Sequence, residues 1–503
     1  MSAEIHFPQW PVEVVRRIAA ERGARVWPVG GSVRDALMGR ARHDWDFAVE
    51  GDALGLARTV ADTLGGAFYP LDEERDTGRV ILWREERRIE LDFARLRGPD
   101  LESDLRGRDF TVNAIAVGPG GELIDPTGGL ADLQARLVRA IGPEAFDQDP
   151  LRMLRAVRLA AELGFRLEEQ TSRWIAQRAR ELLRSSPERV RDEFVRILNA
   201  PSVAYYLQIL DELGLMDFII PEVDALREQQ QTSPHRFNVW WHTLMTVEAA
   251  ENILHILGVL RGEMETLYVD APTWAWDDVR EMLEPFAALL TDHLRQPVAF
   301  RRYRRTLSIL AALLHDIGKP LTCTEEVKPG EEKIVLHFYG HENVGARLAA
   351  DRMRALRFSR AETDAVARMI RAHLRPSFLA DAPGGVTGRA AYRFFKATGE
   401  SGVEVVLLAL ADHLSIWGPN LQPDRWERRL EAARRLLTYY SERVGQKGQP
   451  RLVTGEDLMQ ELGLSPGPQI GRLLEAIQEA QAEGTIRTRE EALDLARRMV
   501  QGR

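Results

Sequence analysis

The stretch VGGSVRDALMGRARHDWDF (Val29–Phe47) decides how the N-terminal part of the chain folds. It begins where the apolar run Arg25–Val29 ends, so the pattern predicts a strand, a glycine turn, a helix and a second strand. Gly30 and Gly31 have no Cβ and allow a ligand to approach the backbone closely. Free N–H groups at the start of the predicted helix attract phosphate oxygens. This unit is typical of proteins that bind a nucleoside triphosphate.

Three aspartates follow this turn. Asp44 and Asp46 lie two residues apart on the predicted second strand, where side chains at i and i+2 point to the same face. Two carboxylates placed in this way can hold divalent cations between a triphosphate and an attacking hydroxyl. A surface turn with two solvated aspartates is the alternative that a lone DxD pattern would favour. The alternating run RRIELDFARLR (Arg87–Arg97) adds Asp92 as a third carboxylate, either a metal ligand or a group that polarises the hydroxyl.

The segment FDQDPLRMLRAVRLAAELGF (Phe146–Phe165) is predicted to form one amphipathic helix that opens with an Asp-Pro signal. Asp149 and Arg152 are three residues apart and would share one face of this helix. A carboxylate and a guanidinium together can bind the Watson–Crick edge of a base, because one accepts hydrogen bonds and the other donates them. By spacing alone, an ion pair between them on the helix surface is the simpler interpretation.

These segments resemble, in order, the motifs of the class II tRNA nucleotidyltransferase and bacterial poly(A) polymerase family over residues 25–200. GGSVRD with DWDF is similar to the first motif, GRDFTVNAIA to the RRDFTxNA motif, DPTGGLADL to the linking motif, QDPLR to the base-selecting EDxxR motif and ERVRDE to the helical motif after it. The resemblance implies that Asp44 and Asp46 bind Mg²⁺, and that Asp149 and Arg152 select cytosine or adenine without a nucleic-acid template. The other nucleotide-binding residues that it implies are Gly30, Gly31, Arg34, Asp35, Arg108, Asp109, Asn113, Arg155 and Arg158.

Two departures from the family pattern bear on specificity. Gln148 stands where the family usually has glutamate. The stretch between Asp92 and Arg108 (Phe93–Gly107) has only fifteen residues. In full CCA-adding members this stretch is longer and includes a flexible loop implicated in switching from C to A. The shorter stretch predicts that CC addition alone is an alternative to full CCA addition.

The second half of the chain carries a set of histidines and aspartates that are able to bind metal ions. LLHDIGKP places His315 and Asp316 directly after an apolar helical pattern. Imidazole nitrogens and carboxylate oxygens suit borderline and hard divalent cations. Each lone histidine has a packed core position as its alternative, whereas the HD pair is more specific. The other members of the set are His242, His341, His373 and Asp412.

This set resembles the HD phosphohydrolase superfamily over residues 231–440. The resemblance implies that His242, His315, Asp316 and Asp412 are the core metal ligands. His341 and His373 would add ligands for a second metal, and Lys319 would lie near the phosphate of a phosphoester substrate. The metal would be a divalent transition metal, Mg²⁺ or Mn²⁺. A degenerate helical domain without activity is the alternative.

Composition favours a multidomain enzyme of the cytoplasm. A chain of 503 residues is too long for one core, and its single cysteine, Cys323, fits a reducing compartment. The start of the sequence lacks the pattern of a signal peptide, and no apolar run approaches a membrane-spanning length. The net charge of −9 is not typical of a nucleic-acid binder, but a local basic patch on the neck helices could still follow a tRNA backbone, so charge does not decide the partner. The resemblance implies tRNA, and no DNA partner is expected.

The predicted fold class is mixed: an α/β head with a small mixed sheet, followed by all-α regions. We expect a nucleotidyltransferase head over residues 1–140, a helical base-selecting and RNA-binding neck over 141–230, a helical HD domain over 231–444 and a small helical tail over 451–503.

The favoured function is template-independent addition of C, with or without A, to tRNA 3′ ends from CTP and ATP. One alternative is a poly(A) polymerase on the same scaffold. Another is an HD phosphodiesterase or phosphatase whose head serves as an RNA-binding module.

Overall fold

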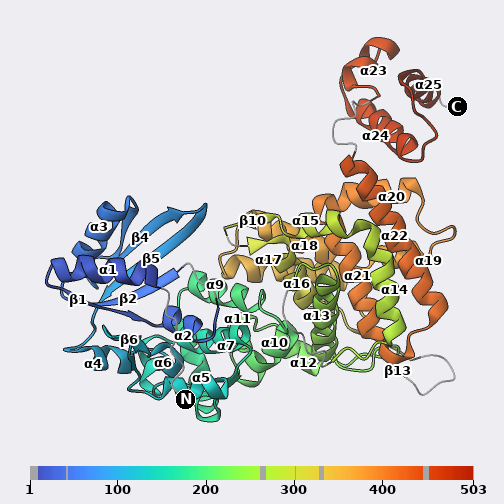
Figure 1. Ribbon diagram of the computed structural model, residues 1–503. Coiled ribbons are helices and arrows are strands. Elements are labelled where there is room, and N and C mark those ends of the chain that lie inside the picture. Colours follow the sequence, from blue (N-terminus) through green and yellow to red (C-terminus); the bar gives the residue numbers. More distant parts are fainter. Residues whose placement is uncertain are drawn as a thin grey trace. The chain divides into compact units, whose positions relative to one another are not determined.

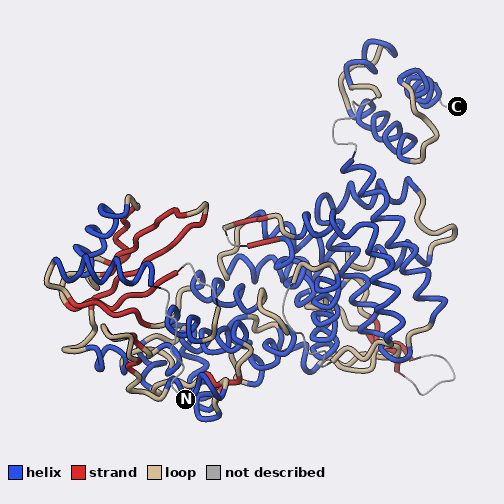
Figure 2. The backbone as a smooth tube through the Cα atoms, viewed as in Figure 1, coloured by secondary structure: helices blue, strands red, loops and turns tan. Residues whose placement is uncertain are grey.

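The computed structural model describes residues 9–40, 44–260, 268–300, 302–327, 334–445 and 452–501. Contacts between residues divide the chain into two compact units. Unit 1 comprises Met1–Glu193 and Glu212–Phe218, and unit 2 comprises Phe194–Asp211 and Ile219–Arg503. Strands are concentrated in the N-terminal part and helices in the rest (Figures 1 and 2). The predicted fold class, an α/β head followed by helical regions, is confirmed.

A seven-stranded mixed sheet, in the order β3-β4-β5-β2-β1-β6-β7, organises unit 1. Strands β2 and β5 run parallel, and the other neighbouring pairs are antiparallel. The strands are β1 (Arg25–Val29), β2 (Asp44–Glu50), β3 (Ala67–Asp72), β4 (Thr77–Arg84), β5 (Arg87–Arg95), β6 (Ala116–Val117) and β7 (Leu123–Ile124).

The two faces of this sheet carry different side chains because strand residues alternate in direction. One face is apolar and packs with α1 (Gln9–Glu21) and α3 (Ala53–Leu64) into a core that includes Phe47 and Phe93, whose rings stack at 5.1 Å. Asp44 and Asp46 alternate with the buried Trp45 and Phe47. The aspartates therefore point to the opposite face, as the sequence pattern predicts.

The predicted single helix over Phe146–Phe165 is wrong. The structure has two helices, α6 (Glu144–Gln148) and α7 (Arg152–Leu163), separated by an extended Asp149 with φ −147° and ψ 98°. Pro150 is the physical reason, because the residue before a proline is excluded from the helical region. Asp149 therefore lies in the break between two helices. Helices α8 (Glu169–Arg178) and α9 (Pro187–Ile197) follow in the neck.

Unit 2 is mostly helical. Its main helices are α10 (Val203–Glu212), α12 (Val223–Glu228), α13 (Val239–Ile256), α14 (Thr273–Leu283), α15 (Ala287–Leu294), α16 (Arg304–Leu314), α17 (His341–Ala355), α18 (Arg360–Ala372), α19 (Arg375–Asp381), α20 (Gly388–Thr398), α21 (Gly402–Trp417) and α22 (Pro423–Gly445). Helix α13 packs on α16 and α21, and α18 packs on α16 and α17. The stretch Gly388–Asn420 is long and apolar enough to cross a membrane by composition, but 89% of its apolar window is buried inside the protein, as in a core helix.

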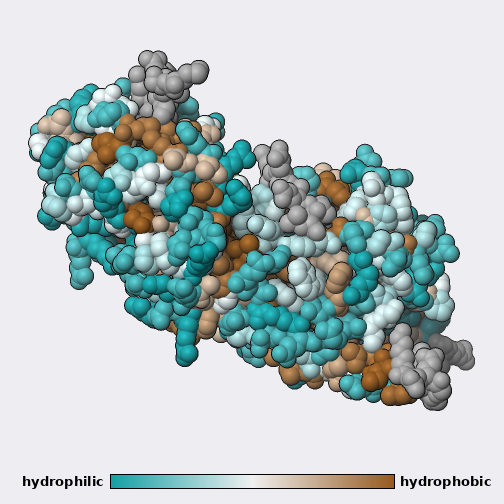
Figure 3. Space-filling model, turned by 90° about the horizontal axis from the view of Figure 1, so that it is seen from below, coloured by the Kyte–Doolittle hydropathy of each residue, from teal (hydrophilic) through white to brown (hydrophobic). Residues whose placement is uncertain are grey.

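Three further helices, α23 (Gly455–Leu462), α24 (Pro468–Ala482) and α25 (Arg489–Val500), enclose a small apolar core of their own. Helices α23 and α25 each begin with a capping box, at Thr454 and Thr488, which fixes where they start. On the face drawn in Figure 3, hydrophilic residues dominate and apolar residues gather in separate patches.

Candidate active sites

The glycine turn brings the backbone of unit 1 against two charged side chains. Gly30 has φ +73° and begins α2 (Gly31–Leu37). A Cβ at Gly30 would lie 2.9 Å from Nη1 of Arg108 and 3.4 Å from Oδ2 of Asp46. The predicted turn, the predicted metal ligand Asp46 and the predicted nucleotide contact Arg108 therefore meet at one point, which only a glycine leaves open.

The carboxylates form a row on one face of the sheet. Asp46 is the lateral neighbour of Asp92 in the β2–β5 pairing, and Asp44 is the neighbour of Glu90. Asp44 is exposed, whereas Asp46 and Asp92 are half-buried. This row agrees with the prediction that Asp44, Asp46 and Asp92 share a face.

Asp92 has a partner that the sequence analysis missed. Arg79 on β4 donates to both carboxylate oxygens of Asp92, from Nε and Nη2, at 2.7 Å each. A further ion pair joins Arg79 Nη1 to Glu90 at 2.9 Å. The hydrogen bonds that Arg79 donates to Asp92 raise the pKa of Arg79, so the guanidinium stays charged. The sequence did indicate two adjacent strands that could form a hairpin. In the structure β4 and β5 form that hairpin, and its register places Arg79 opposite Asp92.

A chain of hydrogen bonds links the glycine turn to the neck. Arg34 on α2 donates to Asp35 at 2.7 Å and to Asn113 at 2.5 Å. Asn113 in turn donates to Asp109 at 3.1 Å, and Asp109 forms an ion pair with Arg155 of α7 at 3.0 Å. Burial disfavours the charge on Asp109, but Arg155 and Asn113 outweigh it and hold its pKa below the usual range. Five of the predicted nucleotide-binding residues therefore form one connected network.

The predicted base-reading pair does not form an ion pair in the structure. Asp149 binds Arg189 of α9 at 2.7 Å, whereas Arg152 donates to the backbone oxygen of Ala145 at 3.2 Å and to Gln148 at 3.3 Å. The ion pair expected from the spacing is wrong, because Asp149 lies outside the helix that Arg152 begins.

Arg158 and Arg152 of the neck both interact with neighbouring charged groups. Arg158 forms an ion pair with Glu193 at 3.0 Å. Burial lowers the pKa of Arg152, and the positive charges of Arg97 and Arg155 lower it further. Carboxylates compensate part of this charge, since Arg155 pairs with Asp109 and Arg158 with Glu193.

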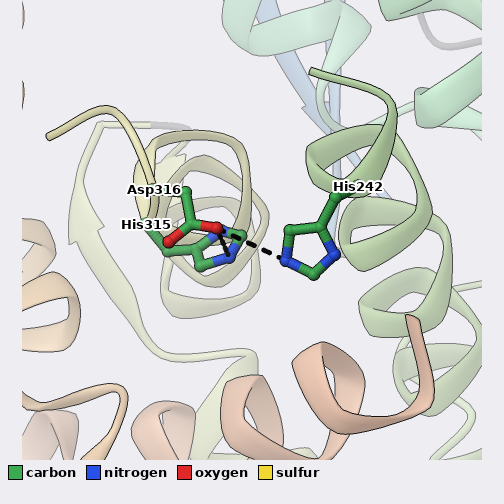
Figure 4. A group of neighbouring side chains, drawn as sticks. All are labelled: His242, His315 and Asp316. Atoms are coloured by element: carbon green, nitrogen blue, oxygen red, sulfur yellow. Dashed lines mark ion pairs between the residues drawn. The ribbon is translucent and has the colours of Figure 1, made fainter. Parts of the chain in front are cut away.

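In unit 2, the predicted HD residues lie together at the meeting point of five helical segments. Asp316 Oδ2 lies 3.4 Å from His242 Nε2 and 3.2 Å from His315 Nε2, as Figure 4 shows. The other oxygen of Asp316, Oδ1, lies 3.3 Å from His341 Nε2, which lies 3.4 Å from His373 Nε2. Asp412 on α21 approaches His242 at 3.1 Å. All six predicted ligands are at most 8% exposed.

The histidines present the nitrogen atoms that a metal would need. Nδ1 of His315 lies 2.8 Å from the backbone oxygen of Ala312, Nδ1 of His341 lies 2.7 Å from that of Phe338, and Nδ1 of His373 lies 2.7 Å from that of Ile370. A carbonyl only accepts, so Nδ1 carries the proton and Nε2 is directed into the cluster. His242 Nε2, His315 Nε2 and Asp316 Oδ2 are buried atoms whose partners are the charged groups of the cluster itself.

These atoms form two groups that could each hold a cation. The first is His242, His315 and Asp316, and the second is Asp316, His341 and His373; the atoms of each group lie within 4.8 Å of one another. Asp316 belongs to both groups. Nitrogen and carboxylate donors in this arrangement fit a pair of divalent metal ions, with Asp316 as the shared ligand.

Charges inside the cluster compensate one another. Burial lowers the pKa of His315, but the carboxylate of Asp316 outweighs it and raises that pKa to about 10. Burial and the charge of His315 lower the pKa of His373 to about 4, so its ring is neutral. Lys319, predicted near a phosphate, lies 2.6 Å from Asp316 and donates to Gln231 at 2.6 Å.

The sequence analysis missed two residues beside this cluster. Gln231 binds Lys319, and the ring of His235 lies 5.1 Å from that of His242, edge to face. Burial and the charge of Lys319 lower the pKa of His235 to about 3. Both precede α13 in a segment without regular structure, where a search for ligands at helical spacing does not look.

Comparison with known families agrees with this geometry. Family sequence models match residues 26–139 (Poly A polymerase head domain), 164–227 (Probable RNA and SrmB- binding site of polymerase A), 283–417 (HD domain) and 433–496 (tRNA nucleotidyltransferase domain 2 putative). The HD match begins after His242 and α13.

Relatives are similar over nearly the whole chain. The A-adding tRNA nucleotidyltransferase of Deinococcus radiodurans is 34% identical, covering 92% of this chain and 93% of that protein. The CC-adding tRNA nucleotidyltransferase of Thermus thermophilus is also 34% identical, covering 93% and 92%.

Solved structures share the fold. A CCA-adding enzyme complexed with CTP has a TM-score of 0.62 at 20% identity and covers 98% of this chain and 95% of its own. The Thermotoga maritima CCA-adding enzyme complexed with tRNA has a TM-score of 0.60 at 21% identity, covering 99% and 97%. With curated relatives this similar over more than nine-tenths of its length, the chain belongs to the tRNA nucleotidyltransferase family of enzymes.

Proposed function

We propose that this protein adds two cytidines to the 3′ end of tRNA, transferring CMP from CTP without a nucleic-acid template. The relatives named above divide into A-adding and CC-adding enzymes at equal identity, so identity does not choose between these activities. The observation that carries the proposal is the short connection between Asp92 and Arg108.

This connection is compact and ordered. Strand β5 ends at Arg95, and α4 (Leu101–Arg106) begins after five intervening residues, with Asp100 as its N-cap. Asp104 of α4 is 3% exposed; it accepts hydrogen bonds from Arg108 Nη2 at 3.0 Å and from the backbone of Arg97 at 3.2 Å. The segment thus holds Arg108 at the glycine turn. It has no room for the flexible loop that the family resemblance associates with the change from C to A.

Each group of the head has a role in this proposal. The open backbone at Gly30 and the guanidinium of Arg108 would bind the triphosphate, and the network from Arg34 to Arg155 would align the turn with the neck. Asp44 and Asp46 would hold Mg²⁺, which supplies charge neutralisation at the triphosphate and the attacking hydroxyl when bound. Among the described residues, no group of three metal ligands forms in the head, so the nucleotide itself would complete that site.

Base selection would fall to Asp149 and Arg152 at the break between α6 and α7. Arg189 is 53% exposed at its side chain and holds Asp149 through a single oxygen, Oδ2. The same carboxylate can therefore turn to the exocyclic amine of cytosine while Arg152 donates to the ring. Arg155 and Arg158 would add positive charge behind this pair.

The experiment is a single-turnover assay with tRNA that ends before CCA and, in parallel, tRNA that ends in CC, each offered CTP alone, ATP alone and both. Growth by two nucleotides with CTP, and by two with both, is the expected result. Growth by three with both would make the protein a full CCA-adding enzyme. Growth only on tRNA that already ends in CC, by one nucleotide with ATP, would make it an A-adding enzyme. A long ladder with ATP alone would make it a poly(A) polymerase.

A second activity is supported by a separate observation, the buried cluster around Asp316. We infer that unit 2 hydrolyses a phosphoester. Divalent metals held by the two ligand groups would activate water and bind the phosphoryl oxygens. The ammonium of Lys319, already fixed at Asp316, would lie beside the phosphate.

Assays of hydrolysis with p-nitrophenyl phosphate and bis-p-nitrophenyl phosphate, with Mg²⁺, Mn²⁺ or Ni²⁺ added, test this activity. Wild type is expected to release nitrophenol and the Asp316→Asn variant is not. Equal release by both proteins would contradict the assignment.

A further inference from the structure

One row of residues crosses four strands of the head and connects the glycine turn with an arginine. The pairing register aligns Val29 of β1 with Asp46 of β2, Asp46 with Asp92 of β5, and Asp92 with Arg79 of β4. Lateral neighbours in a sheet point to the same face, and neighbouring strands lie about 4.8 Å apart. Arg79 therefore lies two strands beyond Asp46, about 10 Å away, on the side opposite Gly30.

The guanidinium of Arg79 is fixed but accessible. Asp92 holds Nε and Nη2 in a bidentate pair, and Glu90 holds Nη1 at 2.9 Å. The side chain of Arg79 remains 33% exposed, whereas that of Glu90 is 9% exposed. A bidentate carboxylate orients a guanidinium without removing its charge, and its remaining edge can meet a second anion.

The direction of phosphoryl transfer decides which anion that is. In transfer from a triphosphate, the attacking oxygen and the leaving oxygen lie roughly in line through the reacting phosphorus. If the triphosphate lies at Gly30 and Arg108, the leaving pyrophosphate is on the β1 side of the carboxylates. The attacking 3′-hydroxyl then approaches over β5 and β4, and the phosphodiester next to that hydroxyl follows it.

We propose that Arg79 binds the terminal phosphodiester of the RNA being extended, and that Asp92 is the positioning residue that orients Arg79. This inference rests on the proposed function. It gives Asp92 a different role from that of a third metal ligand, because both of its oxygens accept hydrogen bonds from Arg79. The two roles predict different kinetics. Loss of a metal ligand lowers kcat, whereas loss of a group that binds the RNA raises the KM for RNA.

The experiment compares Arg79→Ala, Arg79→Lys and Asp92→Asn in steady-state CMP addition to tRNA that ends before CCA. Arg88→Ala is the matched control, because Arg88 also pairs with Glu90, at 3.0 Å, but lies four residues before Asp92 on β5 and outside the row. Arg79→Ala and Asp92→Asn are expected to raise the KM for tRNA about 10- to 100-fold, the size of one charge-assisted hydrogen bond. The KM for CTP and kcat should stay within about twofold, and Arg79→Lys should recover part of the loss.

A substrate change tests the contact itself. A minihelix RNA whose last linkage is a neutral methylphosphonate should bind wild type as weakly as Arg79→Ala binds the natural RNA, and it should bind both proteins equally. The comparison of methylphosphonate and natural RNA on wild type alone already tests the contact, so a variant that fails to fold does not decide the outcome.

Three results would overturn the inference: an unchanged tRNA KM in Arg79→Ala, a loss of kcat in Asp92→Asn without a change in tRNA KM, or a methylphosphonate RNA that binds wild type normally. Failure of the proposed function is a separate result, because it is read from which nucleotides wild type adds, whereas the inference is read from the KM for RNA.

Discussion

The two sites of this protein differ in how far their ligand atoms are assembled before any ligand binds. In the HD cluster, six potential ligands are at most 8% exposed and fall into two groups of three with Asp316 in common. In the head, Asp44 is exposed, and Asp92 is engaged by Arg79. The comparison teaches that a buried site must be complete on its own, whereas an open site can leave completion to its substrate.

The physical reason is the cost of buried charge. A carboxylate in the interior is stable only when it is paired or hydrogen-bonded. Asp316 meets that condition through Lys319 and His315. The head keeps its carboxylates near water, where an arginine on the neighbouring strand is enough to compensate them. In the proposed function, the first site would hold metal ions that stay bound, and the second would hold a metal–nucleotide complex that leaves after each turnover.

The largest expected effect tests whether the two sites act independently of each other. Asp44→Ala is expected to lower CMP addition at least about a thousandfold, the order lost when a group that stabilises the transition state is removed. Because Asp44 is exposed, the fold should not change, and phosphoester hydrolysis in unit 2 should stay at the wild-type rate. Asp62→Ala, an exposed aspartate on α3, is the control and should keep both activities. Normal CMP addition by Asp44→Ala would refute the metal assignment.

The number of metal ions bound per chain tests whether Asp316 is a ligand in both groups. Equilibrium dialysis with Mn²⁺ should find two ions per chain in wild type, one in His341→Ala and none in Asp316→Asn, since only Asp316 belongs to both groups. The same Mn²⁺ should raise the unfolding temperature of wild type but not that of Asp316→Asn, because a ligand stabilises only the state that binds it. CMP addition should be unaffected. Retention of one ion by Asp316→Asn would show that the groups are separate.

A smaller effect is expected at the glycine turn. Gly30→Ala should lower the kcat/KM for CTP about 10- to 100-fold, because its Cβ would displace Arg108 in addition to straining the backbone. Gly121→Ala is a matched control: Gly121 also has positive φ, +87°, but its Cβ would meet nothing within 4 Å. Gly121→Ala should lose only the stability that backbone strain costs, on the order of 1 kcal/mol, and should keep CMP addition. Equal losses in both variants would assign the effect to strain alone.

The smallest expected effect concerns pH and the stability of unit 2. Glu251 on α13 accepts hydrogen bonds from the backbones of Val203 and Ala204, yet burial raises its pKa to about 7. Folded protein therefore holds a proton that unfolded protein, with a pKa near 4.5, releases. Between pH 4.5 and 7 the free energy of unfolding should fall as pH rises, by on the order of 3 kcal/mol.

Urea unfolding of wild type and of Glu251→Gln across this range measures that contribution. The variant should lack the part of the pH slope that Glu251 causes. Identical slopes in the two proteins would contradict it.

The sequence predicted which residues form the two sites better than it predicted the side chains that those residues contact. The HD pair, the three further histidines and Asp412 meet as expected from the resemblance to the HD superfamily, although His293 and His413 are also buried elsewhere in unit 2. The glycine turn and the aspartates of β2 were predictable because their spacing acts within one short unit.

What failed depended on tertiary structure or on a single dihedral angle. Pro150 forces Asp149 out of the helix, so Asp149 binds Arg189 forty residues later in place of Arg152. Arg79 was missed because its importance comes from the register of β4 on β5, which strand periodicity alone does not define. His235 and Gln231 were missed because they act from a segment without periodicity.

The short connection between β5 and α4 also constrains how this protein could evolve. Its five residues, Leu96–Asp100, span at most roughly 17 Å when fully extended, and Asp100 and Asp104 already serve the helix and Arg108. Exchanging side chains cannot give such a segment the length of a mobile loop. Giving this segment the length of such a loop would need inserted codons. Lengthening a surface loop costs only about 0.6 kcal/mol for each doubling, so the barrier to that change is the rarity of the insertion and not its effect on folding.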